Sequence, residues 1–523
     1  MLRSGVVIAA LALLAACSTL REDYAKPVSV AQAPVVDTPS ARYTEAEQDK
    51  HPADQSGFRL LTLSSNALMS RIALADRAER TLDLQYYIFR QDETGRLMMR
   101  HLLKAADRGV RVRLLLDDLK LDKEVQMFDA LDAHENIEVR LFNPFNSRQP
   151  NFLHKSAQML MEFRRLNRRM HNKSFIADNR VAIVGGRNMA DDYFDADEKS
   201  NYRDLDLLAI GPVVQDASRS FDAYWNDAAS VPVSAYDTAR DTQADLVELR
   251  KELGAHAREF AQSDYAQAVL DELPNGATAD RRGQWFWGTA VLVADQPEKI
   301  DPDQDRAGLR MGPGVKAVID SAKSELLLMS PYFVPSDQDV KDFAALANRG
   351  VTMRFLTNSL ASTDEPAVQA GYSEHRRGLL SGGIELHELK PVAGVKQTAT
   401  QYGSSSGVSL HAKSFVVDRR FVFVGSMNMD QRSKLLNTEM GIIVDSPALA
   451  KAVGDFFAVA TMPANAYRLA LESPDGSGGG SGQIIWITTE EGRPVTLTTE
   501  PGVGAARRIE VMLLKLLPID SLL

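Results

Sequence analysis

The chain has 523 residues, of which 44% are hydrophobic and 25% are charged, and it contains a single cysteine. This composition is that of a globular protein of about two to four domains, and it excludes a fibrous or low-complexity protein. One cysteine excludes an intramolecular disulfide framework and any CxxC zinc or redox site. The formal net charge of −10 argues against a dedicated nucleic-acid binder, although it leaves room for a local basic patch.

The first residues have the layout of a secretory signal. Arg3 precedes an apolar run from Gly5 to Ala16, which is shorter than the ~20 residues that a membrane-spanning helix needs. The run ends in Leu-Ala-Ala followed by Cys17, which resembles the lipobox of bacterial lipoproteins and uses the only cysteine of the chain. The resemblance implies a signal peptide at residues 1–16 that is removed, and a lipid attached to Cys17.

The polar, proline-dotted segment 17–57 is typical of a flexible tether. It shows no helical period, which disfavours a buried N-terminal helix as the alternative. Ser18, rather than an aspartate, follows Cys17, so no signal for retention at the inner membrane is present. We therefore expect a lipid-anchored protein of the bacterial cell envelope, at the periplasmic face of the outer membrane.

An internal repeat begins after the tether. In residues 79–119, a strand-like run (82–89) precedes a helix-like run (97–106), an Arg-Gly-Val tripeptide and a second strand-like run (112–116). Residues 324–360 repeat this order. Strand, helix and strand with a glycine after the helix indicate a βαβ unit.

The repeat predicts an α/β protein of two lobes, each a mixed β-sheet flanked by helices, related by a pseudo-twofold axis. The predicted boundaries are residues 58–235 for the first lobe, 236–312 for a connecting insertion, 313–470 for the second lobe, and 471–523 for a C-terminal hairpin and amphipathic helix.

Each half also carries one copy of a nineteen-residue segment, at 171–189 and 411–429, in which ten positions are identical. Its residues at positions one and three are histidine and lysine, which share a face of a strand, and its eighteenth is asparagine. If Asn179 and Arg180 form a hairpin turn, His171 pairs with Asn188, and the same arithmetic pairs His411 with Asn428. Duplication then offers two histidines, two lysines and two asparagines that could converge on one site.

This set of side chains suits the cleavage of a phosphodiester. One neutral imidazole can attack phosphorus, and the other, protonated, can donate a proton to the leaving oxygen. Lysine and asparagine supply hydrogen-bond donors where charge develops on the phosphoryl oxygens. No HExxH or cysteine/histidine cluster is present, so we expect no metal and no cofactor.

The duplicated pattern H-x-K-x4-D-x6-G-[G/S]-x-N resembles the phospholipase D superfamily, over about residues 60–465. The resemblance implies a two-lobed α/β fold and a ping-pong reaction through a phospho-histidine, with His171 as nucleophile and His411 as acid. The residues that match its active-site positions are His171, Lys173, Asp178, Asn188, His411, Lys413, Asp418 and Asn428. The two aspartates fall at the hairpin turn, where a structural role fits as well as a catalytic one.

The family also carries a downstream carboxylate that holds a histidine through its second ring nitrogen. Glu439 fits this position in the second half, and alignment of the following strand places Asp204 there in the first half. Gly186 stands where the family often has serine, whereas Ser426 keeps the serine in the second half.

Within the superfamily, the chain resembles bacterial cardiolipin synthases of the C type. The resemblance rests on the segments 85–89, 166–173, 185–194 and 516–520. It implies phospholipid substrates, with transfer of a phosphatidyl group from phosphatidylethanolamine to phosphatidylglycerol. The alternatives are a phospholipase D that releases phosphatidic acid, a nuclease, and a non-catalytic lipoprotein scaffold.

Basic and apolar residues alternate at helical spacing from Met159 to Met170. This pattern suits contact with anionic lipid headgroups, and it suits the solvated face of an ordinary helix equally well. The same arginines could line a path for DNA, but the net negative charge and the expected membrane anchor argue against nucleic acid as a partner.

Overall fold

The structure is a computed structural model, and it describes residues 18–20, 23–121, 125–148, 152–236, 242–272, 284–304, 307–391, 407–472 and 482–516. The expected signal peptide (1–16) and Cys17 lie outside the described residues. None of the helices in the described ranges combines the length and the hydropathy that crossing a bilayer requires.

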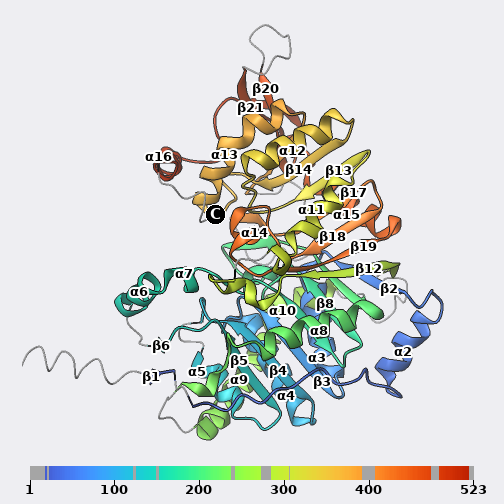
Figure 1. Ribbon diagram of the computed structural model, residues 1–523, viewed down its shortest axis with the longest axis vertical. Helices are drawn as coiled ribbons and strands as arrows, with labels where there is room; N and C mark the ends of the chain where they lie inside the picture. Colours follow the sequence, from blue (N-terminus) through green and yellow to red (C-terminus); the bar gives the residue numbers. More distant parts are fainter. Residues whose placement is uncertain are drawn as a thin grey trace, which may run out of the picture.

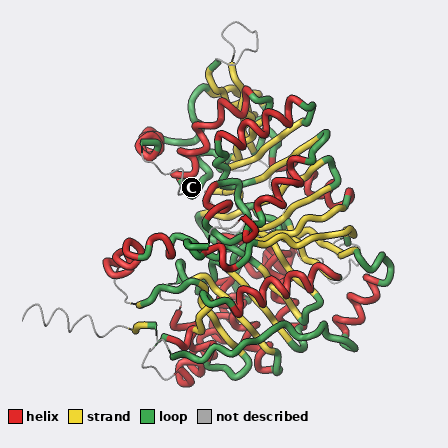
Figure 2. The backbone as a smooth tube through the Cα atoms, in the orientation of Figure 1, coloured by secondary structure: helices red, strands yellow, loops and turns green. Residues whose placement is uncertain are grey.

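A continuous run of paired strands passes through both lobes (Figures 1 and 2). In spatial order the first lobe contributes β11 (Ser230–Pro232), β5 (Ile137–Phe142), β4 (Arg111–Asp117), β3 (Thr81–Tyr86), β7 (Ser174–Ala177), β8 (Val181–Gly185), β10 (Asp206–Ile210) and β2 (Gln55–Leu61). After β12 (Phe286–Ala294), the second lobe contributes β19 (Met440–Asp445), β18 (Phe421–Gly425), β17 (Lys413–Val417), β13 (Glu325–Met329), β14 (Thr352–Asn358), β15 (Glu385–Leu389), β20 (Ala466–Glu472), β21 (Gln483–Glu490) and β22 (Arg493–Leu497).

The two halves repeat the same topology, as the sequence predicts. The strands β3, β4 and β5 run parallel, and so do β13, β14 and β15. In each lobe an antiparallel hairpin, β7–β8 or β17–β18, pairs with the first of these parallel strands. The predicted βαβ units and the pseudo-twofold relation are therefore confirmed.

The register of the two hairpins differs from the predicted one by a residue. Ala177 pairs with Val181, and Lys413 pairs with Gly425, so each turn holds three residues instead of two. Asp178 and Asn179 adopt φ angles of 54° and 50°, a left-handed conformation that aspartate and asparagine tolerate better than most residues. The predicted pairing of His171 with Asn188 is therefore wrong, and the asparagines reach the site by another route.

Helices cover the sheet and bury apolar side chains against it. Those of the first part of the chain are α2 (Pro39–Gln48), α3 (Ser64–Arg77), α4 (Glu93–Asp107), α5 (Val125–Asp132), α6 (Phe152–Met161), α7 (Phe163–Leu166), α8 (Pro212–Asn226), α9 (Thr242–Phe260) and α10 (Asp264–Glu272). Those of the second part are α11 (Gly312–Asp320), α12 (Asp337–Asn348), α13 (Pro366–Ser381), α14 (Gln431–Leu435), α15 (Pro447–Ala460) and α16 (Ala505–Leu514).

One apolar core is shared by both lobes. It contains Val184 and Phe221 from the first lobe, and Val424, Ile442 and Phe457 from the second. Since burial of apolar surface is the main stabilising term, this shared core holds the lobes in one fixed relation. Each lobe also has a core of its own on the other side of its sheet.

Strand β12 lies in the segment that the sequence assigns to a connecting insertion. It pairs with β2 on one side and with β19 on the other, so it joins the two half-sheets. The C-terminal prediction is confirmed: β21 and β22 form a hairpin around Glu491 and Gly492, and α16 follows.

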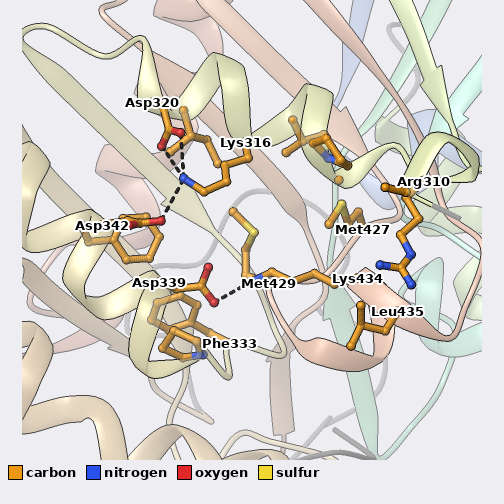
Figure 3. Close-up of a pocket in the computed structure, with 17 residues that line it drawn as sticks. Arg310, Lys316, Asp320, Phe333, Asp339, Asp342, Met427, Met429, Lys434 and Leu435 are labelled. Atoms are coloured by element: carbon orange, nitrogen blue, oxygen red, sulfur yellow. Dashed lines mark hydrogen bonds and ion pairs between the residues drawn. The ribbon is translucent and has the colours of Figure 1, made fainter. Parts of the chain in front are cut away.

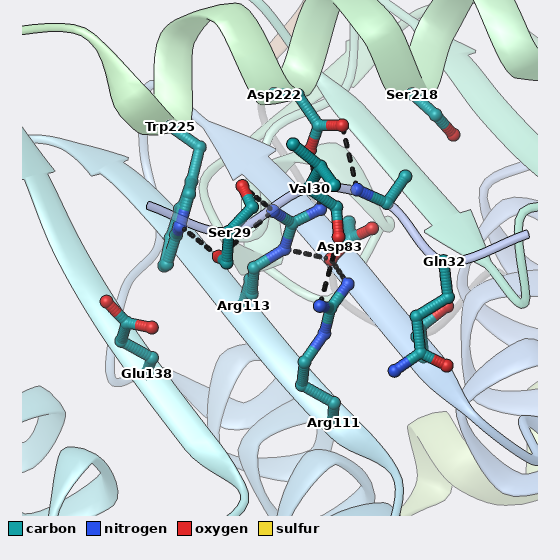
Figure 4. Close-up of polar contacts among 12 residues, drawn as sticks. Ser29, Val30, Gln32, Asp83, Arg111, Arg113, Glu138, Ser218, Asp222 and Trp225 are labelled. Atoms are coloured by element: carbon teal, nitrogen blue, oxygen red, sulfur yellow. Dashed lines mark hydrogen bonds and ion pairs between the residues drawn. The ribbon is translucent and has the colours of Figure 1, made fainter. Parts of the chain in front are cut away.

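Residues 23–57 differ from the predicted flexible tether, because they pack on the first lobe. The buried guanidinium of Arg113 donates a hydrogen bond to the Ser29 carbonyl oxygen at 3.0 Å and pairs with Asp83 and Asp222 (Figure 4). The Ala31 N–H donates to Asp222 at 2.7 Å. A buried cation needs such partners, and the extended chain supplies them with backbone carbonyls. The segment continues into α2 and into β2, which is part of the sheet.

Candidate active site

Each motif histidine lies where one lobe meets the other. The His171 N–H donates to the Thr438 carbonyl oxygen of the second lobe at 2.9 Å. The His411 N–H donates to the Arg203 carbonyl oxygen of the first lobe at 2.8 Å. Here β9 (Ser200–Arg203) and β16 (Gly407–Leu410) form a two-stranded parallel sheet across the lobes. Both backbones are thus fixed at the same interface.

The carboxylates are exchanged between the lobes. His171 Nδ1 lies 2.8 Å from Oε2 of Glu439, and His411 Nδ1 lies 2.6 Å from Oδ2 of Asp204. Both carboxylates are completely buried. A carboxylate at Nδ1 holds the proton on that nitrogen, so Nε2 of each ring keeps its lone pair for phosphorus. The sequence predicts both carboxylates, and the structure adds that each one serves the histidine of the opposite lobe.

The two lysines tie the cluster together. Lys173 Nζ donates to the His171 carbonyl oxygen at 2.5 Å, and Lys413 Nζ donates to the His411 carbonyl oxygen at 2.6 Å. Each ammonium group acts on both imidazoles, because the charges of both lysines lower the pKa of each histidine. The duplicated motif therefore builds one site rather than two.

The protonation states follow from burial. Burial, aided by the lysine charges and opposed by the carboxylates, lowers the pKa of His171 and of His411 to about 4. Burial also lowers the pKa of Lys173 to about 7 and of Lys413 to about 8. At neutral pH both imidazoles of the free protein are neutral, while the lysines carry much of their charge. The neutral imidazoles can thus act as nucleophiles, and the charged lysines can bind an anion.

Three tyrosines surround the imidazoles, and the sequence does not predict them. The Tyr87 ring lies edge-on to His171 with centroids 5.1 Å apart, and the rings of Tyr193 and Tyr202 each lie 5.0 Å from His411. A search for repeats does not find these tyrosines, because they do not recur in the second half. The strand register and the bridges of Phe89 and Phe333 align the two halves, and in this alignment a proline occupies the position equivalent to Tyr87.

Asn188 reaches the site through one of these rings. Its Nδ2 donates to the Tyr193 hydroxyl at 2.8 Å, and its Oδ1 accepts from the Ile88 N–H. Asn428 is buried two residues after Ser426, and its Oδ1 has no hydrogen-bond partner within the described ranges. This buried amide oxygen is available to accept a hydrogen bond from a substrate hydroxyl.

Asp178 and Asp418 do not lie in the cluster. The Asp178 carboxylate accepts the backbone N–H groups of Glu79, Arg80 and Thr81 at 2.8–3.1 Å. Asp418 accepts the backbone N–H groups of residues 323–325 in the same way. Both aspartates therefore hold the hairpin turns against the start of a neighbouring strand, at the far end of the hairpins from the histidines, which favours the structural of the two roles that the sequence left open.

The glycine at 186 has a steric reason. A Cβ there would lie 2.2 Å from Oδ1 of Asp204, which is too close for any side chain. At the equivalent position, the Ser426 hydroxyl donates to Oε2 of Glu439 at 2.5 Å. The longer glutamate leaves room for serine, whereas the shorter aspartate requires glycine.

An apolar cavity of about 360 Å³ lies beside the second motif copy (Figure 3). Met427 and Met429, the neighbours of Asn428, line it together with Phe333. Lys434 of α14 pairs with Asp339 in the same wall. Most of the surface that lines the cavity is thus apolar, and ion pairs of Lys316 and Lys434 lie in its wall, next to the second motif segment.

The arrangement of these side chains indicates which reaction the site can catalyse. Two imidazoles, one from each lobe, lie within the electrostatic influence of both lysines, and such a set of groups suits a single phosphodiester anion. Comparison with known proteins agrees with this reading. The family model described as "Cardiolipin synthase, PLD-like domain" matches residues 72–225 and 315–459, so both halves of the repeat are covered. The chain belongs to the phospholipase D superfamily.

Similar proteins cover almost the whole chain. Cardiolipin synthase C of Escherichia coli is 38% identical over 479 residues, which is 91% of this chain and 97% of that protein. An uncharacterized protein of Helicobacter pylori is 31% identical over 481 residues, 90% of this chain and 91% of that protein. The crystal structure of a phosphatidylserine synthase of Haemophilus influenzae matches with a TM-score of 0.52 and 14% identity, over 82% of this chain and 91% of that one, and supports the fold. The chain is accordingly a phosphatidyltransferase of the phospholipase D type.

Proposed function

We propose that this enzyme makes cardiolipin by moving a phosphatidyl group from phosphatidylethanolamine to phosphatidylglycerol. The observation that carries the proposal is the pair of imidazoles whose Nδ1 atoms are held by carboxylates of the opposite lobes. The similarity to cardiolipin synthase C over 91% of the chain supports the choice of lipid substrates. The apolar cavity beside Asn428 suits an acyl chain.

In the first half-reaction, Nε2 of His171 attacks the donor phosphorus. A nitrogen–phosphorus bond forms, the bond from phosphorus to the ethanolamine oxygen breaks, and the leaving oxygen takes a proton from His411. Binding of the phosphodiester anion raises the pKa of His411, because a negative charge favours the imidazolium. Lys173 and Lys413 stabilise the charge that develops on the phosphoryl oxygens.

In the second half-reaction, a headgroup hydroxyl of phosphatidylglycerol takes the place of ethanolamine. His411 accepts the proton of that hydroxyl, the oxygen attacks phosphorus, and the bond to His171 breaks. His411 thus donates a proton in the first half-reaction and accepts one in the second, as microscopic reversibility requires.

The contacts of the two carboxylates favour this order. Asp204 lies 2.6 Å from His411 and accepts no side-chain hydroxyl from the described part of the chain, whereas Glu439 lies 2.8 Å from His171 and shares its oxygen with Ser426. Burial opposes ionisation of Asp204, but the charges of His411 and Lys413 bring its pKa down to about 2. Asp204 is therefore the better partner for an imidazolium, which suits His411 as the acid.

We further propose that the protein is a lipoprotein of the bacterial envelope, anchored through Cys17 at the periplasmic face of the outer membrane. The lipobox-like end of the apolar run supports this location. Replacement of Cys17 by serine is expected to release the protein from the membrane and to leave its turnover of added lipids intact.

The deciding experiment incubates the purified chain with phosphatidylglycerol and phosphatidylethanolamine and identifies the products by mass spectrometry. Cardiolipin with free ethanolamine supports the proposal, and EDTA should not reduce the yield. Phosphatidic acid alone would make the protein a hydrolase instead. His171→Ala and His411→Ala serve as controls that should form neither product.

A further inference from the structure

Helices α6 and α7 present apolar side chains to solvent. Leu160 and Met161 are 79% and 85% exposed, and Phe163 is 42% exposed. Arg164 stands next to them with an exposed side chain, which lies 3.5 Å from the equally exposed carboxylate of Asp303. The sequence left open whether this stretch is an interface or an ordinary solvated face. A solvated face would not show three adjacent large apolar side chains.

The neighbouring part of the same stretch is structural. Arg169 is completely buried and pairs with Asp117 at 2.8 Å, and Leu166 is also buried. Only residues 160–164 of this stretch combine apolar exposure with a basic side chain, so the exposed group is compact.

Helix α16 is built in the same way on the second lobe. Val511 packs into a small core with Leu360 and Ala370. The opposite side exposes four large apolar residues, by 51% to 77%, and the exposed basic residues Arg508 and Lys515 stand among them. The four are Ile509, Met512, Leu513 and Leu516.

Both elements are connected to residues near the junction of the lobes. Arg432 of α14 donates to Asn167, the residue after α7, at 2.8 Å. On the other lobe, burial raises the pKa of Glu365, and the charges of Lys120, Arg432 and Arg507 oppose this rise. Arg507 lies on α16. The charge of Glu365 in turn adds to the rise that burial causes in the pKa of Tyr87, whose ring contacts His171. Figure 1 shows α6, α7 and α16 projecting from the same side of the molecule, one group from each lobe.

Ser18 and Thr19 lie on this side as well. Strand β1 (Ser18–Thr19) pairs with β6 (Ser147–Arg148), which directly precedes the connection to α6. The packed segment 23–57 leaves no long tether between Cys17 and the folded lobe. A membrane attachment at the start of the chain would therefore bring α6 to the bilayer.

We infer that residues 160–164 and the exposed face of α16 form one docking surface for a phospholipid bilayer with anionic headgroups, and that it holds the opening of the active site against the lipid. The apolar side chains enter the headgroup region, while the arginines and the lysine bind lipid phosphates. This inference rests on the proposed function for its lipid substrates. It adds the surface through which the enzyme reaches them.

A local probe tests the surface independently of any other membrane attachment. Cys17→Ser removes the only cysteine of the full chain. Met161→Cys or Leu513→Cys then carries an environment-sensitive dye, and Val291→Cys, which is 61% exposed on β12, is the matched control. With vesicles of phosphatidylglycerol and phosphatidylethanolamine, the dye at 161 and at 513 should brighten several-fold and shift to the blue, whereas the dye at 291 should not change. An unchanged signal at 161 and 513, or an equal response at 291, would overturn the docking surface.

A second test separates docking from chemistry. Leu160→Ser, Met161→Ser, Leu513→Ser and Leu516→Ser are combined in one variant, and Val247→Ser, Leu270→Ser and Val291→Ser in a control. The first variant should lose several-fold in turnover on vesicles and keep its turnover on short-chain lipids dissolved as monomers, while the control keeps both. Equal losses on both substrates would contradict docking as the cause. If the wild type turned over neither substrate, the proposed function would fail, whereas the dye measurement would still decide the docking surface.

Discussion

Replacement of Asp204 by asparagine tests the carboxylate exchange between the lobes. The carboxylate lies 2.6 Å from His411 Nδ1 and is completely buried, so the amide takes its place without a change in volume. An amide that turns its NH2 group to Nδ1 stabilises the tautomer with the proton on Nε2, which removes the lone pair that accepts the hydroxyl proton in the second half-reaction. It also removes the charge that stabilises the imidazolium.

The size of the effect follows from a related geometry. In the serine-protease triad, the same replacement beside a histidine lowers kcat about 10⁴-fold, mainly through the wrong tautomer. This loss corresponds to about 5 kcal/mol of transition-state stabilisation. Because Asp204 holds His411 through the same atom, we expect a loss in kcat of about 10³- to 10⁴-fold. The loss should appear in both half-reactions, since His411 transfers the proton in each.

Asp178→Asn is the matched control. It makes the same chemical change at a buried aspartate that holds three backbone N–H groups at a hairpin turn. It should lower the free energy of unfolding by about 1–3 kcal/mol and leave kcat nearly unchanged. Steady-state rates with dissolved lipid, and thermal unfolding of both variants, give the answer. If Asp204→Asn retained kcat, or if Asp178→Asn lost as much, the assignment of the carboxylates would be refuted.

Further predictions concern the same cluster. Gly186→Ser should abolish most activity, because its Cβ would displace Asp204. Ser426→Gly should lower activity less, since it removes only one hydroxyl donor from Glu439. The turnover rates of both variants test this difference. The value of kcat/KM should fall as pH rises above about 7 to 8, where the two lysines lose their charge; a flat profile to pH 9, two units above the pKa of about 7, would contradict it. Burial lowers the pKa of His171 from 6.5 to about 4, so its contribution to stability is present above pH 6.5 and lost as pH falls towards 4; denaturant titrations should show a shallower loss for His171→Gln. The double replacement of both histidines by alanine should be little slower than either single one, because the two act as a unit.

Much of the fold could be predicted from the sequence, for identifiable reasons. The buried parallel strands are apolar runs, the helices between them carry an apolar stripe, and Gly109 and Gly350 take φ angles of 89° and 90° after the helices. These local signals recur in both halves, and duplication makes each half a check on the other. The histidines and lysines were predicted in the same way, and the downstream carboxylates were predicted from the resemblance to the phospholipase D superfamily.

Other features depend on interactions that no repeat records. The register of the hairpins is set by a three-residue turn, which Asp178 holds by binding distant backbone amides. The packing of residues 23–57 depends on the buried Arg113, whose need for partners cannot be read from a polar, proline-containing segment. Tyr87 and Tyr193 belong to one half only, so their role becomes visible when the rings are seen against the imidazoles.

The central claim is that one phosphorus atom is reached by both histidines, and a structure with bound vanadate tests it most directly. Vanadate adopts the five-coordinate geometry of a phosphoryl group under attack. We predict one vanadate per chain, bonded to Nε2 of one histidine and with an apical oxygen within hydrogen-bond distance of Nε2 of the other. Two vanadates held by separate histidines, or one bound away from both, would contradict the account.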